Sequence, residues 1–312
     1  MKISLIATVL NAEEHVGAFL ASIDAQTRRP DEIVIVDGGS TDGTVAALRA
    51  ADGLTLLEEP GANISRGRNV AIGHAAHELI AVADADCEYD PAWLAALIAP
   101  LEDGADVSMG WTEPIVDSLL SACVSSLGLP LSPTEVDAAT FMPSARSVAF
   151  RREALDAVGG YPEWLAIGED MWVNHRWRER PFDLRFAPEA VAGWRPRTSL
   201  DAIWTQYLQY ARGDAQASMY PERHALRFAV YGGLVAALVS RRTWPKLLVA
   251  GGAIAYARTP VHRARARAPQ RRFAATVLTP VLLAVTDLAK MFGYALGLRD
   301  RLRGVAQDSS SH

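Results

Sequence analysis

The first 110 residues alternate short apolar runs with segments of helical periodicity, and this alternation restricts the fold more than any other feature of the sequence. It predicts an α/β fold with a mostly parallel central sheet and helices on both faces. Strands are expected at 3–9, 32–36, 54–57, 79–83 and 106–109, and helices at 13–25, 44–50, 65–76 and 91–101. Further along, a strand is expected at 146–151 and helices at 153–158, 169–178 and 200–211.

Polar residues gather where three of these strands end. The clusters run from Thr8 to Asn11, from Asp37 to Asp42 and from Asp84 to Asp86. In open α/β sheets, ligands bind beyond the carboxyl ends of the strands. The sequence therefore predicts one site at this edge, built from all three clusters.

The third cluster, Asp84-Ala85-Asp86, carries two carboxylates one residue apart. Side chains alternate between the faces of a strand, so both carboxylates point the same way. Such a pair can hold a hard divalent cation against a diphosphate. A chain with 36 acidic residues contains an Asp-x-Asp about once by chance, so the motif gains meaning only from its neighbours.

The second cluster is a glycine-rich loop, residues 37–44. Gly38 and Gly39 let the backbone approach a ligand closely, and Asp37 can accept hydrogen bonds from a nucleobase or ribose. A plain turn in which Asp42 caps the next helix is the alternative. The chain has neither a Gly-x-Gly-x-x-Gly after its first strand nor the lysine of a P-loop, which disfavours dinucleotide binding and P-loop chemistry.

The C-terminal part differs in charge and hydropathy, so we expect a domain at 1–220 and an apolar, basic helical tail at 221–312. Residues 241–272 carry nine lysines and arginines and no acid. Three apolar segments, 228–239, 247–257 and 273–285, are each shorter than the roughly 20 residues of a spanning helix. Basic connections flank the middle segment on both sides, which argues against its crossing a bilayer.

We therefore predict interfacial or re-entrant helices at an anionic membrane surface rather than several spans. A tight hairpin and buried helices of a soluble protein are the alternatives. Nucleic acid is not expected as a partner, because the basic run lacks interleaved aromatic residues. Cys87 and Cys123 have no ligand spacing, which favours a reducing compartment without a zinc site. The N-terminal apolar run is too short for a signal peptide.

Four segments in this order and spacing resemble the family 2 glycosyltransferases: Asp37 to Thr44, Arg66-Gly67-Arg68-Asn69, Asp84-Ala85-Asp86 and Gly168-Glu169-Asp170. The resemblance covers roughly residues 1–215 and implies a GT-A fold and a nucleotide-sugar donor. Residues 143–150, 159–163, 194–197 and 207–214 are similar to the branch that contains succinoglycan-type exopolysaccharide glycosyltransferases.

Two positions depart from the usual pattern of that family. Leu10 stands where many members have a tyrosine that stacks on the base, and Gly38 replaces a second aspartate. Both positions touch the nucleobase in the family. A guanine or thymine donor therefore remains open beside the usual uracil.

The resemblance also implies roles for individual residues. Asp86 is the expected ligand of Mg²⁺ or Mn²⁺, and Asp84 serves the ribose or a metal-bound water. Asp170 is the expected general base, and Glu169 orients it or binds the acceptor. The nucleotide-diphosphate sugar is expected to contact Thr8, Asn11, Asp37, Arg68, Asp84, Arg146 and Arg212, with Arg68 bracing the Asp37 and ribose side and Arg212 clamping the diphosphate.

These assignments predict an inverting, metal-dependent glycosyltransferase at the cytoplasmic face of a bacterial-type membrane. Its acceptor would be a hydroxyl of a saccharide carried on a polyprenyl diphosphate, in exopolysaccharide or cell-surface glycan synthesis. A sugar-phosphate nucleotidyltransferase is the alternative enzyme, but Thr8 to Glu13 is not its glycine-rich basic loop. A membrane-docked scaffold without activity is the other alternative, although Asp84, Asp86, Glu169 and Asp170 are all intact.

Overall fold

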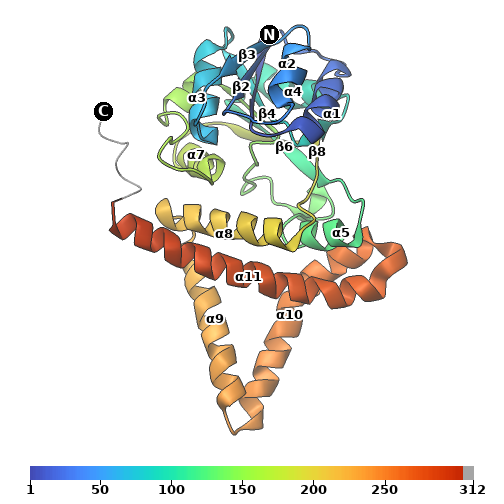
Figure 1. Ribbon diagram of the computed structural model, residues 1–312, viewed down its shortest axis with the longest axis vertical. Helices are drawn as coiled ribbons and strands as arrows, with labels where there is room; N and C mark the ends of the chain where they lie inside the picture. Colours follow the sequence, from blue (N-terminus) through green and yellow to red (C-terminus); the bar gives the residue numbers. More distant parts are fainter. Residues whose placement is uncertain (305–312) are drawn as a thin grey trace. The chain divides into compact units, whose positions relative to one another are not determined.

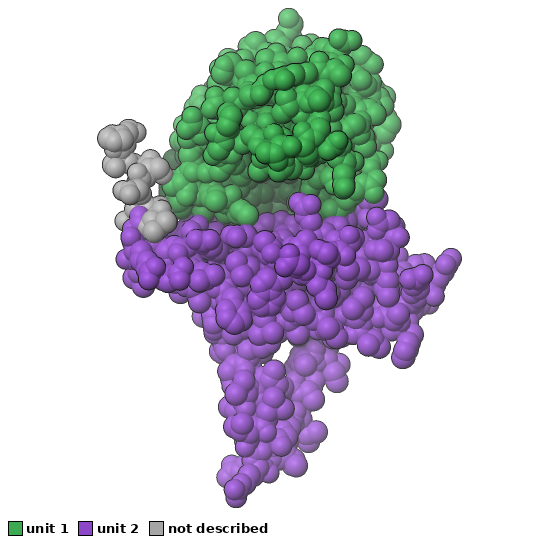
Figure 2. Space-filling view, in the orientation of Figure 1, with its two compact units in different colours: residues 1–113, 132–195 green, residues 114–131, 196–312 purple. Residues whose placement is uncertain are grey.

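The computed structural model describes residues 1–304, which form two compact units (Figures 1 and 2). The sheet unit comprises residues 1–113 and 132–195, and the helical unit comprises residues 114–131 and 196–304. The expected boundary at residue 220 thus differs from the division seen here, which assigns 114–131 and 196–220 to the helical unit.

The sheet unit contains one eight-stranded sheet in the order β3-β2-β1-β4-β7-β6-β8-β5. Its strands are β1 (Ile3–Val9), β2 (Glu32–Asp37), β3 (Thr55–Glu58), β4 (Leu79–Asp84), β5 (Cys87–Tyr89), β6 (Val107–Pro114), β7 (Val148–Arg151) and β8 (Leu184–Trp194). Its helices are α1 (Glu13–Asp24), α2 (Thr44–Arg49), α3 (Ile64–His74), α4 (Trp93–Glu102), η1 (Pro133–Glu135), α6 (Arg152–Asp156) and α7 (Glu169–Arg178).

The strands from β3 to β4 are parallel, as the alternation predicted, and the α/β class is confirmed. The other half of the sheet is antiparallel where β4 meets β7, where β7 meets β6 and where β8 meets β5. Because β7 runs against β4, with Val148 opposite Val82, β7 begins beside the carboxyl end of β4. The residues just before β7 therefore reach the edge at which ligands are expected.

Buried side chains cover both faces of the sheet. On one face, Ile6, Val82 and Phe150 pack with the inner sides of α3, α6 and α7. Leu5 and Ala81 alternate with these residues along the same strands and are fully buried on the other face. A strand buried on both faces reads as a continuous apolar run, which is why the sequence located these strands well.

The helical unit consists of α5 (Leu119–Ser125), α8 (Leu200–Gln216), α9 (Pro221–Val239), α10 (Thr243–Arg267), η2 (Pro269–Arg271) and α11 (Arg272–Leu302). Helix α11 packs along α8 at close range. A Cβ atom on Gly293 would clash with the carbonyl oxygen of Leu208, and one on Gly297 with that of Arg212. The two glycines thus bring the backbones of α8 and α11 together.

The apolar tail forms longer helices than its apolar segments suggested. The segment 273–285 continues through Asp287 to Leu302 as the 31-residue helix α11. Asp287 interrupts the apolar run, which resumes at Leu288. Arg227 Nε of α9 pairs with the Asp287 carboxylate at 2.9 Å and permits its burial inside the helix.

Within residues 1–304, one helical stretch, Pro269–Leu302, is long and apolar enough to cross a membrane. Its most apolar window has a mean hydropathy of 1.5, and 44 % of that window is buried. The core helix of a soluble protein passes the same test of length and composition. Helices α9 and α10 form a hairpin (Figure 1). Large apolar side chains are exposed along both arms: Leu226, Phe228, Val230, Val235, Leu238, Val239, Trp244, Leu247, Leu248, Ile254 and Tyr256.

Replacing Gly293 by alanine should destabilise the helical unit by about 1–3 kcal/mol, because the added methyl group would force α8 and α11 apart. The matched control is Gly251→Ala in α10, where a Cβ meets nothing within 4 Å. That change should stabilise the protein by about 0.5–1 kcal/mol through helix propensity. Thermal unfolding should show shifts of opposite sign, and equal shifts would refute the close approach.

Candidate active site

The carboxyl ends of β1, β2 and β4 meet at one edge of the sheet. Thr8 of β1 lies between Val36 of β2 and Asp84 of β4 in the strand register. The side chain of Thr8 fills the space beside Gly67 of α3, where a Cβ atom would lie 2.8 Å from the threonine methyl group. The structure thus brings together the three polar clusters that the sequence placed at strand ends.

The glycine-rich loop is held by Asp37 and Asn11. Asp37 is 2 % exposed, and its Oδ1 accepts hydrogen bonds from the backbone N–H groups of Gly39 at 3.0 Å and Ser40 at 2.9 Å. Asn11 has a positive φ of 50°, donates its backbone N–H to Ser40 Oγ and accepts from the Thr41 N–H. Both predicted donor-binding residues therefore use these polar atoms to shape the loop.

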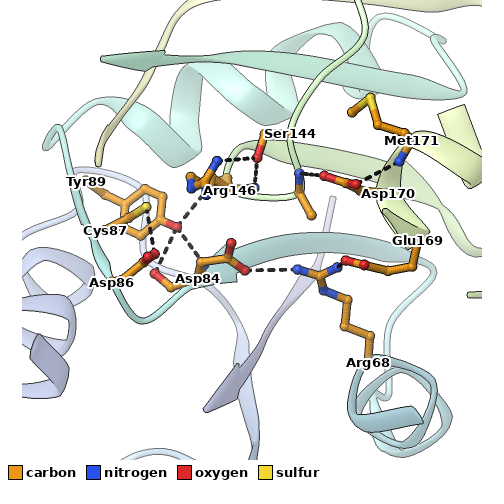
Figure 3. A network of polar contacts seen from close by, with 11 residues as sticks. Arg68, Asp84, Asp86, Cys87, Tyr89, Ser144, Arg146, Glu169, Asp170 and Met171 are labelled. Atoms are coloured by element: carbon orange, nitrogen blue, oxygen red, sulfur yellow. Dashed lines mark hydrogen bonds and ion pairs between the residues drawn. The ribbon is translucent and has the colours of Figure 1, made fainter. Parts of the chain in front are cut away.

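Within the sheet unit, Arg68 connects Asp84 at the end of β4 to Glu169 at the start of α7 (Figure 3). Its guanidinium is 1 % exposed; Nη2 donates to Asp84 Oδ1 at 3.0 Å, and Nη1 donates to Glu169 Oε1. The sequence placed Arg68 against Asp37 and the ribose. Because α3 directs this side chain inward toward the end of β4, its partners are Asp84 and Glu169 instead.

Burial and charge act against each other in this network. Burial alone would lower the pKa of Arg68, but the carboxylates of Glu169 and Asp84 raise it above its usual value. Burial raises the pKa of Glu169 to about 7, and Arg68 limits the rise while Asp170 adds to it. Glu169 therefore carries a proton at a higher pH than an ordinary glutamate.

The Asp84–Asp86 segment turns sharply between β4 and β5, and Tyr89 fixes the turn. The Tyr89 hydroxyl accepts the Asp84 N–H at 2.9 Å and donates to the Arg146 carbonyl oxygen at 3.0 Å. Burial raises the pKa of Tyr89 well above its usual value, so the hydroxyl keeps the proton that it donates. Asp86 is partly exposed, and its Oδ1 accepts a bond from Cys87 Sγ at 3.5 Å.

Arg146 lies immediately before β7, at the same edge. Its Nη1 donates to Ser144 Oγ at 3.0 Å, and its guanidinium carbon lies 4.6 Å from the centre of the Trp194 ring. Trp194 comes from β8, a strand that the sequence analysis did not predict. Stacking on this ring holds the guanidinium in place beside the Asp84–Asp86 turn (Figure 3).

Glu169 and Asp170 open α7 after Gly168, whose φ of 91° suits glycine. Asp170 Oδ1 accepts the Met171 N–H at 2.8 Å, and Oδ2 accepts the Ala145 N–H at 3.3 Å. Glu169 is buried, whereas Asp170 is partly exposed. Of the two, Asp170 is the carboxylate that a substrate can reach.

Arg212 is placed by α8 in the helical unit. Its Nε donates to Asp300 Oδ2 at 2.6 Å, and Asp300 is 4 % exposed. This ion pair lowers the pKa of Asp300, whose burial alone would raise it. Within the helical unit, Arg212 thus links α8 to α11.

The carboxylates beside β4 suit a divalent cation that takes some ligands from the protein and the others from a substrate. Within residues 1–304, no three His, Cys, Asp or Glu side chains gather closely enough to hold a metal ion. Mg²⁺ commonly binds through one or two carboxylates and completes its shell with substrate phosphates and water. Asp86 together with the free oxygen of Asp84 fits that donor set, because Arg68 engages only Asp84 Oδ1.

The chain is similar to known glycosyltransferases. Residues 4–123 match the model of the family described as Glycosyl transferase family 2. An uncharacterized glycosyltransferase of Mycobacterium bovis, Mb0553, is 29 % identical over 195 residues, which cover 60 % of this chain and 85 % of that protein. The succinoglycan biosynthesis protein ExoA of Rhizobium meliloti is 26 % identical over 229 residues, 68 % of each chain.

A solved structure shares the fold. It is the mannosyltransferase PcManGT of Pyrobaculum calidifontis, in complex with GDP-Man and Mn²⁺. The two chains superpose with a TM-score of 0.55 at 19 % identity, covering 99 % of this chain and 88 % of that one. This likeness confirms the predicted GT-A type of α/β fold.

Stability should fall as the pH rises from about 4.5 to about 7, because Glu169 has a raised pKa in the folded protein. In that window the unfolded chain has lost this proton while the folded protein still holds it, so raising the pH favours unfolding. Urea unfolding of Glu169→Gln should lack this part of the decline. If the variant and the wild type decline equally across the window, the burial of an acidic Glu169 is not the cause.

Proposed function

We propose a specific reaction for this chain, which belongs to glycosyltransferase family 2. It transfers a sugar from a nucleotide-diphosphate donor to a hydroxyl group of a saccharide acceptor, with inversion at the anomeric carbon. The observation that carries the proposal is the Arg68 network, which joins Asp84 of the donor side to the Glu169-Asp170 pair of the acceptor side.

On the donor side, the nucleoside would lie against the glycine-rich loop, and Asp84 and Asp86 would face the diphosphate. Asp86 would hold Mg²⁺ or Mn²⁺ together with Asp84. When bound, such an ion supplies positive charge that stabilises the leaving diphosphate. Arg146, held over Trp194, is suited to bind a phosphate or the sugar.

On the acceptor side, Asp170 acts as the general base. It takes the proton of the attacking hydroxyl while the oxygen bonds to the anomeric carbon and the bond to the diphosphate breaks. Because attack comes from the face opposite the leaving group, a single displacement inverts the anomeric carbon. Glu169 is buried against Arg68, so it positions Asp170 through the start of α7 and does not touch the acceptor.

The acceptor is proposed to be a saccharide linked to a polyprenyl diphosphate, and the enzyme to work at the cytoplasmic face of the membrane. Support comes from the exposed apolar arms of α9 and α10 and from the basic residues of 241–272. Contiguous exposed apolar surface of this extent is typical of membrane or protein contact. The succinoglycan relative favours a place in polysaccharide synthesis.

The donor can be identified by thermal unfolding with UDP-, GDP- and dTDP-sugars, each with and without Mn²⁺. A ligand that binds the folded protein raises the unfolding midpoint by mass action. Release of nucleoside diphosphate from the donor so found supports a transferase. Release of pyrophosphate would instead indicate a nucleotidyltransferase, and neither release would indicate a scaffold.

Asp170→Asn should lower sugar transfer by about 10²–10⁴-fold, because the attacking hydroxyl loses its base. Donor affinity should stay within about twofold, since donor and base lie on different sides of the reacting carbon. Glu179→Gln at the exposed end of α7 is the matched control and should transfer normally. Transfer by Asp170→Asn near the wild-type rate would disprove its role.

Asp86→Asn should remove the effect of Mn²⁺ on donor binding, with a loss of more than about tenfold in affinity when the metal is present. Without metal, the variant and the wild type should bind alike. Asp52→Asn, which changes an exposed acid between α2 and β3, serves as the charge control. Calorimetry of nucleoside diphosphate binding measures the affinities with and without Mn²⁺. A wild type that binds equally in both conditions would contradict the assignment.

A further inference from the structure

A groove lies between α10 and α11 in the helical unit, and nothing in the proposed reaction uses it. Its volume is about 730 Å³, within the range of small-ligand sites. The residues that line it are Ile254, Ala257, Arg258, Thr259, Val261, His262, Arg265, Thr276 and Pro280. Seven of the nine come from one helix, α10, and the other two from the start of α11.

The groove is cationic along one wall. Arg258, His262 and Arg265 are spaced four and three residues apart, so they share one face of α10. Among residues 1–304, neither Arg258 nor Arg265 pairs with an acid, and residues 241–286 contain none. The nearest acid along the chain, Asp287, is engaged by Arg227 and Tyr256. This positive charge is therefore available to an anionic ligand.

Another arginine of this segment, by contrast, is engaged by hydrogen bonds within the helical unit. Arg267, two residues after Arg265, donates to Ser126 Oγ and to the Leu129 carbonyl oxygen, each at 3.1 Å. It secures α10 to the end of α5. Arg258 and Arg265 have no such structural task, and both are exposed.

The surroundings of the cationic wall are apolar. Ile254, Val261 and Pro280 line the groove itself, and Ile254 is 73 % exposed. On α11, Phe273, Val277 and Val281 are exposed as well. A ligand that matches both features has an anionic head and an apolar chain.

We propose that this groove binds the phosphate headgroup of an anionic membrane phospholipid. Arg258 and Arg265 pair with the phosphate oxygens, His262 and the Thr259 hydroxyl add hydrogen bonds, and an acyl chain lies against Ile254 and Pro280. The inference deepens the membrane location given under Proposed function and rests on it. No Trp, Tyr or Phe lines the groove, so it lacks the stacking platform of a single-stranded nucleic-acid site.

The test measures binding of the full-length chain to vesicles by flotation. One set of vesicles contains phosphatidylcholine alone, and the other contains equimolar phosphatidylglycerol and phosphatidylcholine. The groove variant is Arg258→Gln/Arg265→Gln. The control variant is Arg241→Gln/Arg242→Gln, which removes the same charge from exposed residues between α9 and α10.

Binding of the groove variant to anionic vesicles should fall about thirtyfold, a loss of about 1 kcal/mol for each groove arginine that no longer pairs with the headgroup phosphate. The control variant should keep most of its binding, and binding to phosphatidylcholine alone should be equal for all three proteins. An equal loss in both variants would overturn the site and leave only diffuse attraction. Displacement by millimolar inorganic phosphate would identify a site for free phosphate instead.

Two further measurements distinguish the lipid site from the proposed sugar transfer and from nucleic-acid binding. Donor hydrolysis with Mn²⁺ should be unchanged in the groove variant, because its residues take no part in the proposed chemistry. If hydrolysis is absent in the wild type while the vesicle result holds, the reaction fails and the lipid site stands. Tighter binding of the wild type to a single-stranded oligonucleotide than to anionic vesicles would overturn the lipid assignment.

Discussion

The buried guanidinium of Arg68 is the contact on which the geometry of the sheet unit depends. It comes from α3 and meets one carboxylate at the end of β4 and another at the start of α7. Without it, Asp84 and Glu169 would repel each other in a poorly hydrated place. Removing one partner of a buried ion pair typically costs about 3–5 kcal/mol, because the other charge remains buried. One side chain therefore sets the spacing between the end of β4 and the start of α7.

The four acidic residues of the candidate site differ in their burial and in their hydrogen-bond partners. Glu169 is buried and has a raised pKa, so it serves the structure of the site more than the chemistry. Asp84 offers one oxygen to Arg68 and keeps the other for a ligand. Asp86 and Asp170 are partly exposed and held by weak or local hydrogen bonds, which leaves them accessible to substrate.

The helical unit is governed by a different constraint, the close approach of two backbones. Gly293 and Gly297 let α11 lie against α8, and the ion pair of Arg212 with Asp300 adds a charged link between the same helices. Asp287 would interrupt an apolar helix if it stood alone, but Arg227, Tyr231 and Tyr256 surround its carboxylate. Contacts from other helices thus compensate the buried carboxylate within α11.

By itself, the sequence determined the parallel half of the sheet and the residues at its carboxyl edge, because doubly buried strands leave continuous apolar runs and local periodicity records them. Only the tertiary structure decided the three-residue strand β5 and the strand β8. In β8, Pro188, three alanines and one glycine hide the strand pattern, and this strand supplies the ring that holds Arg146. The tertiary structure also decided the partners of Arg68, since they lie 16 and 101 residues away and no local pattern encodes such pairs.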